Sequence, residues 1–90
     1  MEDLSTSRKK INELDQQLVK LLEERFNVVT EVNDYKLKHD LPVLDAKREQ
    51  QVLTKVAGLT NRSDLLPYLQ EIYQEIMHRS REYQKSQRKD

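Results

Sequence analysis

Residues 4–39 constrain the fold more than any other part of the chain, because they contain neither glycine nor proline. Apolar residues recur within them at alternating steps of three and four, the spacing of one face of an α-helix. The positions are Ile11, Leu14, Leu18, Leu21, Val28, Val32 and Tyr35, and we refer to them as the apolar stripe. The pattern predicts one long helix of roughly 35 residues and about 50 Å.

Such a helix is long for a chain of 90 residues. A compact globule of this size has a radius of gyration of about 12 Å, so the helix would project far beyond its own fold. An exposed apolar stripe of that length is unfavourable in water. We therefore expect a second copy of the chain to cover it, in an intertwined helical homodimer.

Two breaks follow the long helix. The segment HDLPVLD contains Pro42, which ends helical geometry, and GLTNRSD begins with Gly58, which suits a helix C-terminus. A second helix is expected from Asp45 to about Ala57, and a third from about Asp64 to Lys85. The candidate N-caps of the three helices are Ser5 or Ser7, then Asp45, then Asn61 or Ser63. The fold class is therefore all-α, with one long, one short and one medium helix in a single domain spanning residues 1–90.

The charge balance and the missing cysteines exclude several functions. Sixteen basic residues offset sixteen acidic ones, so no net field attracts nucleic acid or an anionic membrane. Without cysteine there is no disulfide, thiolate nucleophile or zinc–thiolate site, and His39 and His78 lack partners at ligand spacing. No segment has the length and apolar character of a membrane span. We expect a cytoplasmic protein that binds neither metal, nucleic acid nor membrane.

Polar residues interrupt the inward faces of all three expected helices, where a buried charge without a partner is costly. They are Arg8, Arg25 and Lys36, then Asp45, Arg48 and Glu49, then Ser80 and Gln84. Each has a simple explanation when taken singly, since an arginine in a helical seam can set register or reach a nearby glutamate. Together, cations, carboxylates, a hydroxyl and an amide converging from three helices indicate a pocket for a small polyanion that carries a hydroxyl.

This set of residues offers neither a nucleophile nor a poised general base. A reaction that needs neither is one in which the site holds a reactive conformer and stabilises developing charge. The residues therefore favour catalysis by proximity and electrostatic preorganisation over proton transfer.

The same residues carry a resemblance to a known family. Arg8 followed by INELDQQLVKLLEER, the lysine of DYK, LPVLDAKRE and IMHRSREYQ resemble the all-helical class of chorismate mutase. The resemblance covers nearly the whole chain and implies an isomerase that converts chorismate to prephenate without a cofactor. No fused dehydratase, dehydrogenase or synthase sequence accompanies it, so the chain resembles the stand-alone form.

For substrate binding, the resemblance implies that Arg25 and Arg8 grip the two carboxylates, with assistance from Arg48 and Ser80. Seventeen residues of helix separate Arg8 from Arg25 by about 25 Å, too far to reach one small substrate from one straight helix. Each site is therefore expected to take Arg8 from the other chain of the homodimer.

For catalysis, the resemblance implies that Lys36 and Gln84 point at the ether oxygen of chorismate. Negative charge grows there as the carbon–oxygen bond breaks, so their hydrogen bonds strengthen in the transition state. Glu49, together with Asp45, would take the ring hydroxyl and help to hold the diaxial substrate conformer.

Two alternatives remain open from the sequence. An isochorismate pyruvate lyase shares this fold and much of this pocket, and it also runs a pericyclic reaction. A helical dimerisation module without catalysis belongs to a different class, and it predicts that positions 25, 36 and 84 tolerate alanine without loss of any activity.

Overall fold

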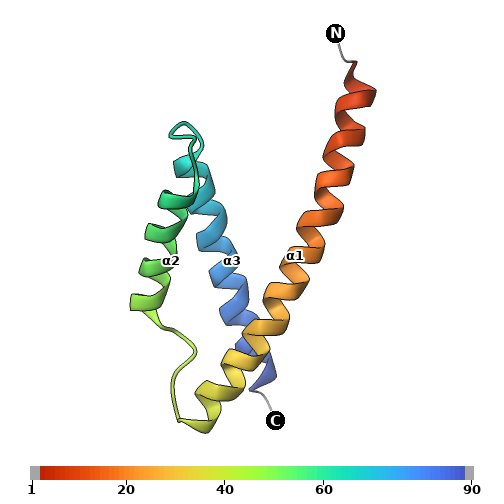
Figure 1. Ribbon diagram of the computed structural model, residues 1–90. Helices are drawn as coiled ribbons and strands as arrows, with labels where there is room; N and C mark the ends of the chain where they lie inside the picture. Colours follow the sequence, from red (N-terminus) through yellow and green to blue (C-terminus); the bar gives the residue numbers. More distant parts are fainter. Residues whose placement is uncertain (1–2, 89–90) are drawn as a thin grey trace.

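The computed structural model describes residues 3–88, which form three helices. They are α1 (Leu4–Lys38), α2 (Ala46–Leu59) and α3 (Leu66–Gln87). In Figure 1, α2 and α3 lie side by side. The C-terminal half of α1 crosses the C-terminal end of α3, and the N-terminal part of α1 extends away from both. The prediction of an all-α chain with one long, one short and one medium helix is confirmed.

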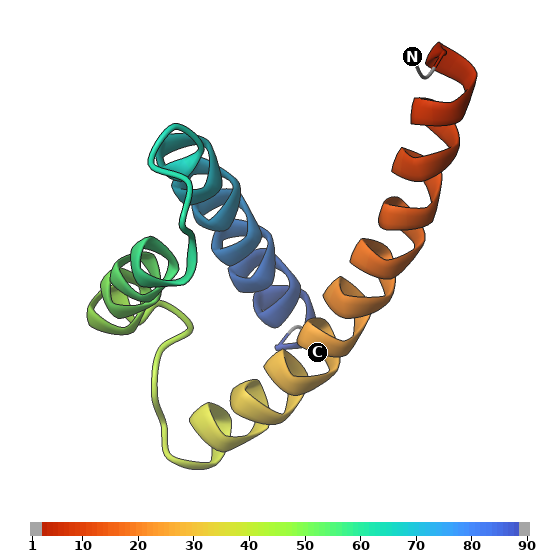
Figure 2. The ribbon, with the colours of Figure 1, turned by 45° about the horizontal axis from the view of Figure 1, so that its top comes forward.

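The shape follows from the length of α1, which has 35 residues. The radius of gyration is 16.5 Å and the longest dimension is 57 Å, against the radius of about 12 Å expected of a compact chain of this size. Figure 2 shows the N-terminal part of α1 standing apart from the other two helices.

Helix α3 connects the other two helices. It packs against α2 and against α1, whereas the backbones of α1 and α2 make no contact within residues 3–88. Phe26 of α1 meets Tyr83 of α3 edge to face, with ring centroids 5.2 Å apart. Among residues 3–88, the buried apolar side chains are Val56 and Met77 alone. The chain therefore has almost no apolar core of its own.

The buried polar side chains in the described chain are Asn33, Ser80 and Gln84. Asn33 of α1 is the most buried of them, with 1% of its surface exposed. Its side-chain oxygen accepts a 2.9 Å hydrogen bond from Arg88 Nε, and its Nδ2 lies 3.5 Å from the backbone oxygen of Gln84. A polar network thus joins α1 to the end of α3.

The helix ends differ in part from those expected. Asp3 caps α1 in place of Ser5 or Ser7, since its side chain accepts a 2.9 Å hydrogen bond from the Thr6 backbone N–H. Ser5 and Ser7 lie inside the helix, two and four residues after the N-cap position. Asp45 caps α2 as expected, by accepting from Arg48 N at 3.0 Å.

The end of α1 is set by local backbone geometry before Pro42 is reached. Asp40 adopts a left-handed conformation with φ 57°, and the N–H groups of Asp40 and Leu41 donate to Leu37 O and Lys36 O. This is the Schellman arrangement, in which an aspartate replaces the usual glycine. The chain then turns toward α2.

The expected roles of Gly58 and of the third cap are wrong. Gly58 lies inside α2, whose C-cap is Thr60, and the glycine has no positive φ. Leu65 occupies the N-cap of α3 without a side-chain hydrogen bond, and Pro67 falls in the first turn. The N–H that Pro67 lacks is one that a first turn leaves unpaired, so this helix start needs less capping by Asn61 or Ser63.

Candidate active site

A cavity of about 280 Å³ lies between the three helices, near the low end of the range for small-ligand pockets. Seven of the eight residues singled out from the sequence line it: Arg25, Lys36, Asp45, Arg48, Glu49, Ser80 and Gln84. The eighth, Arg8, is exposed on the N-terminal part of α1 and does not line this cavity. The described chain therefore brings together the whole predicted site except for the one residue expected from a partner.

Arg25 and Ser80 join the cavity wall through one hydrogen bond. Arg25 Nη1 donates to Ser80 Oγ over 3.0 Å, and Ser80 Oγ in turn donates to the Ile76 backbone oxygen over 2.8 Å. Ser80 is 6% exposed. Its hydroxyl thus holds the guanidinium of Arg25 against α3, which limits the rotamers that this long side chain can sample.

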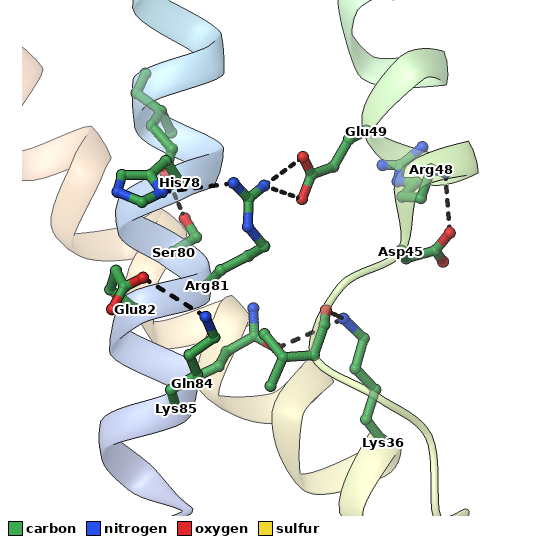
Figure 3. A network of polar contacts seen from close by, with 12 residues as sticks. Lys36, Asp45, Arg48, Glu49, His78, Ser80, Arg81, Glu82, Gln84 and Lys85 are labelled. Atoms are coloured by element: carbon green, nitrogen blue, oxygen red, sulfur yellow. Dashed lines mark hydrogen bonds and ion pairs between the residues drawn. The ribbon is translucent and has the colours of Figure 1, made fainter.

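Lys36 and Gln84 approach each other from α1 and α3 (Figure 3). Lys36 Nζ donates to the Val43 backbone oxygen at 2.8 Å and lies 3.5 Å from Gln84 Oε1. An ammonium has three donors, so one remains after these two contacts. Because the amide oxygen faces Lys36, the NH₂ of Gln84 keeps its donors for another acceptor.

Asp45, Arg48 and Glu49 come from the first turn of α2 and the residue before it. Asp45 uses one carboxylate oxygen to cap the helix at Arg48 N, which fixes the start of α2 beside the cavity. Glu49 is half-buried, and Arg81 of α3 donates to both of its carboxylate oxygens. Figure 3 shows Arg81 reaching from α3 toward Glu49 on α2.

Arg81, Val29 and Val43 also line the cavity and were missed in the sequence. Arg81 had a signal, because it follows Met77 by four residues and precedes Gln84 by three, which places all three on one face of α3. Val43 lies in the connection between α1 and α2, where helical periodicity gives no information.

The charges that line the cavity have an excess of positive sign. Arg25, Lys36, Arg48 and Arg81 contribute four positive charges, whereas Asp45 and Glu49 contribute two negative ones. The sum of plus two matches a small dianion, and a carboxylate beside the cations provides an acceptor for a hydroxyl. Residues 3–88 contain no group of three or more His, Cys, Asp or Glu side chains that could hold a metal ion. None of the helices they form is both long and apolar enough to cross a membrane.

The fold and this cavity define an all-helical protein with a basic pocket for a small anion. Residues 7–85 match the family described as chorismate mutase type II. The chain belongs to that family.

Curated relatives agree with this assignment. The chain is 32% identical over 79 residues to a bifunctional chorismate mutase/prephenate dehydratase of Buchnera aphidicola subsp. Schizaphis graminum, covering 87% of this chain and 20% of that protein. It is 31% identical over 81 residues to a protein of the same description from Aquifex aeolicus, covering 86% of this chain and 22% of that one. The chain thus spans about a fifth of the length of these relatives.

A shorter relative is also similar. A chorismate mutase of Methanocaldococcus jannaschii is 32% identical over 59 residues, which cover 66% of this chain and 60% of that protein. Similarity therefore extends both to bifunctional proteins and to one described by the mutase activity alone.

Proposed function

We propose that the chain catalyses the rearrangement of chorismate to prephenate as a homodimer. The observation that carries this proposal is the convergence of Arg25, Lys36, Glu49 and Gln84 on one cavity of a chain that belongs to the chorismate mutase type II family. These side chains can bind a dicarboxylate that carries a hydroxyl, and they can stabilise the charge that develops when its ether bond breaks. The expected cytoplasmic location and the single-domain organisation form part of the same proposal.

In the proposed mechanism, Arg25 and the partner's Arg8 bind the two carboxylates, and Arg48 and Ser80 assist. The hydrogen bond from Arg25 to Ser80, 3.0 Å long, orients the guanidinium before the substrate arrives. Preorganisation of this kind lowers the entropy cost of binding. The substrate therefore enters a site in which the cation for one of its carboxylates is already oriented.

Lys36 and Gln84 act on the ether oxygen. The 3.5 Å contact of Lys36 Nζ with Gln84 Oε1 keeps both groups at one end of the cavity, and each retains a donor. Charge develops on the ether oxygen only as the bond breaks, so these donors bind the transition state more tightly than the substrate. No proton moves and no covalent intermediate forms.

The homodimer is supported by the apolar stripe of α1. Ile11, Leu14, Leu18 and Leu21 are each more than half exposed in the single chain. A second copy would cover them and bring its own Arg8 toward the first cavity, and two-fold symmetry would make both sites equivalent. Arg8 is the one residue of the predicted set that does not line the cavity of the single chain, and a second copy would supply it.

The test is direct. The purified protein is incubated with chorismate and, separately, with isochorismate, and the products are separated by chromatography. Prephenate from chorismate is the expected result. Pyruvate and salicylate from isochorismate, with chorismate left unchanged, would mean that the chain is the lyase, and no turnover of either compound would contradict both activities.

A further inference from the structure

The ion pair between Arg81 and Glu49 is more shielded from solvent than the pair between Arg79 and Glu75. It joins α3 to α2, and its side chains are only 23% and 25% exposed. Arg79 and Glu75 form a pair within one turn of α3, with side chains 66% and 60% exposed. Exposed pairs of that kind contribute little to the free energy of folding. A shielded pair with two hydrogen bonds restricts the conformations of both side chains.

Arg81 directs its terminal nitrogens at protein groups. Nη1 donates to both oxygens of Glu49, one of them at 2.6 Å, and Nη2 lies 3.5 Å from His78 Nδ1. The guanidinium is therefore engaged before any ligand enters. Two of its five N–H donors, both on Nη1, are directed at Glu49.

Glu49 keeps the capacity to bind a ligand despite this pairing. An ionised carboxylate has about four lone-pair positions, and the contacts from Arg81 leave some of them open. Glu49, Met77 and Arg81 line both the main cavity and a neighbouring hollow of about 300 Å³. The ion pair thus lies in the wall between the two hollows, where it sets the position of the carboxylate at the edge of the main cavity.

We propose that Arg81 is a positioning residue that holds the carboxylate of Glu49 where it receives the ring hydroxyl of the substrate. This inference rests on the proposed function of the same cavity. Without Arg81, the glutamate side chain would sample several rotamers, and binding would have to restrict them. The hydroxyl contact exists in the bound substrate and in the transition state alike, so its loss should raise KM more than it lowers kcat.

The experiment compares the wild-type protein with Arg81→Met, Arg81→Lys and the control Arg79→Met, with chorismate as substrate. Arg81→Met should raise KM by roughly 10- to 100-fold, the scale of a lost hydrogen bond to a charged group, with kcat nearly unchanged. Arg81→Lys keeps the charge and should recover most of the affinity. Arg79→Met should behave as wild type because Arg79 is exposed and pairs away from the cavity.

A double variant tests whether Arg81 acts through Glu49. Glu49→Gln should itself raise KM, and adding Arg81→Met should then have little further effect, because neighbours that act as one unit are not additive. An inhibitor that keeps both carboxylates and lacks the ring hydroxyl should bind the wild type and Arg81→Met equally. This inhibitor separates a role at the hydroxyl from a general loss of the pocket.

Several results would overturn the inference. A purely structural role would reduce the amount of folded enzyme and hence the apparent kcat, while KM of the remaining enzyme stayed the same. A lower KM in Arg81→Met would mean that the ion pair competes with the substrate. A wild type that turns over chorismate normally alongside either result contradicts only the role of Arg81, whereas an inactive wild type contradicts the proposed function as well.

Discussion

The two halves of α1 belong to one helix and share one apolar stripe, yet they have different surroundings. Residues 8–21, the outer half, are all exposed. In residues 22–38, the inner half, Arg25, Phe26, Thr30 and Asn33 contact α3 through hydrogen bonds or ring packing. One regular helix therefore has two environments in the single chain: the inner half contacts α3, and the outer half is exposed.

The inner half itself has two faces with different surroundings. Val28 and Val32 of the apolar stripe remain exposed or line the cavity, while Asn33 faces α3 and is buried. The stripe is therefore exposed along the whole helix in the single chain, and its inner part also lines the cavity. Packing against α3 uses a neighbouring face that combines polar and aromatic residues.

The largest expected effect comes from removing Lys36, the proposed catalytic cation of the inner half. Lys36→Ala should lower kcat by roughly 100-fold or more, since a charged donor to a developing oxyanion contributes about 3 kcal/mol in a shielded site. Steady-state kinetics with chorismate measures this. A loss seen in KM alone would show that Lys36 only binds the substrate, and Lys20→Ala on the outer half provides an exposed control.

A mixing experiment tests whether the outer half completes the site built on the inner half. Arg8→Ala and Arg25→Ala are prepared as separate inactive proteins, unfolded, mixed and refolded. Half the dimers should be mixed, and one site in each should contain both arginines, so roughly a quarter of all sites should regain activity by two-fold symmetry. If mass spectrometry detects mixed dimers and activity stays at the average of the parents, the shared site is wrong.

The uncovered stripe of the outer half predicts a strong effect on assembly. Leu14→Asp should destabilise the dimer by roughly 2 kcal/mol or more per chain, because it would bury a carboxylate without a partner. Sedimentation should detect dissociation at concentrations where the wild type is dimeric. Gln16→Asp, on the opposite face, should stay within about 0.5 kcal/mol of the wild type. Equal behaviour of the two variants would contradict coverage of the stripe.

The stability of the fold should depend on Asn33 in the inner half and not on Asn12 in the outer half. Asn33→Ala removes the acceptor of Arg88 and should lower the free energy of unfolding by about 1–3 kcal/mol, the cost of leaving a buried group unpaired. Asn12→Ala at an exposed position should change it by less than about 0.5 kcal/mol. Urea unfolding measures the free energy of unfolding of both variants. Equal decreases in the two would contradict a special role of Asn33.

The smallest expected effect concerns the N-terminal end of α1, which precedes the outer half. The hydrogen bond from the Thr6 backbone N–H lowers the pKa of Asp3 below its ordinary value of 3.8. Stabilisation from this cap is therefore present above that value and is lost as the pH falls through the lower folded pKa. The Thr6 amide resonance should follow this titration in the wild type and remain unaffected in Asp3→Asn, which caps without a charge. A titrating Thr6 in Asp3→Asn would assign the change to another group.

The sequence was sufficient to predict the three helices, because glycine and proline are rare and the helical period is strong. It was less reliable at the helix ends. Asp3 competes with Ser5 and Ser7 for the same role, and Asp40 adopts a left-handed conformation that is more typical of glycine. These outcomes depend on local backbone geometry that residue types alone do not determine.

The site was predictable to the extent that periodicity assigns residues to faces. It placed Lys36 and Gln84 on faces that do line one cavity. It missed the link of Arg81 to Glu49, which depends on how α2 and α3 pack, and it missed Asn33, a polar residue in a buried position. Neither partner can be identified from spacing within a single helix. The roles of the lining residues in turnover remain predictions.

Because the backbones of α1 and α2 make no contact within residues 3–88, a substrate bound as proposed would also affect the stability of the fold. Arg25 and Lys36 lie on α1, and Arg48 and Glu49 on α2. A ligand bound by both pairs would therefore link two helices that otherwise pack together only through α3. Occupancy should then slow proteolysis and amide exchange in α2 more than in α3, which is already secured on both sides. A bound substrate would then supply the tertiary contacts between α1 and α2 that the single chain lacks.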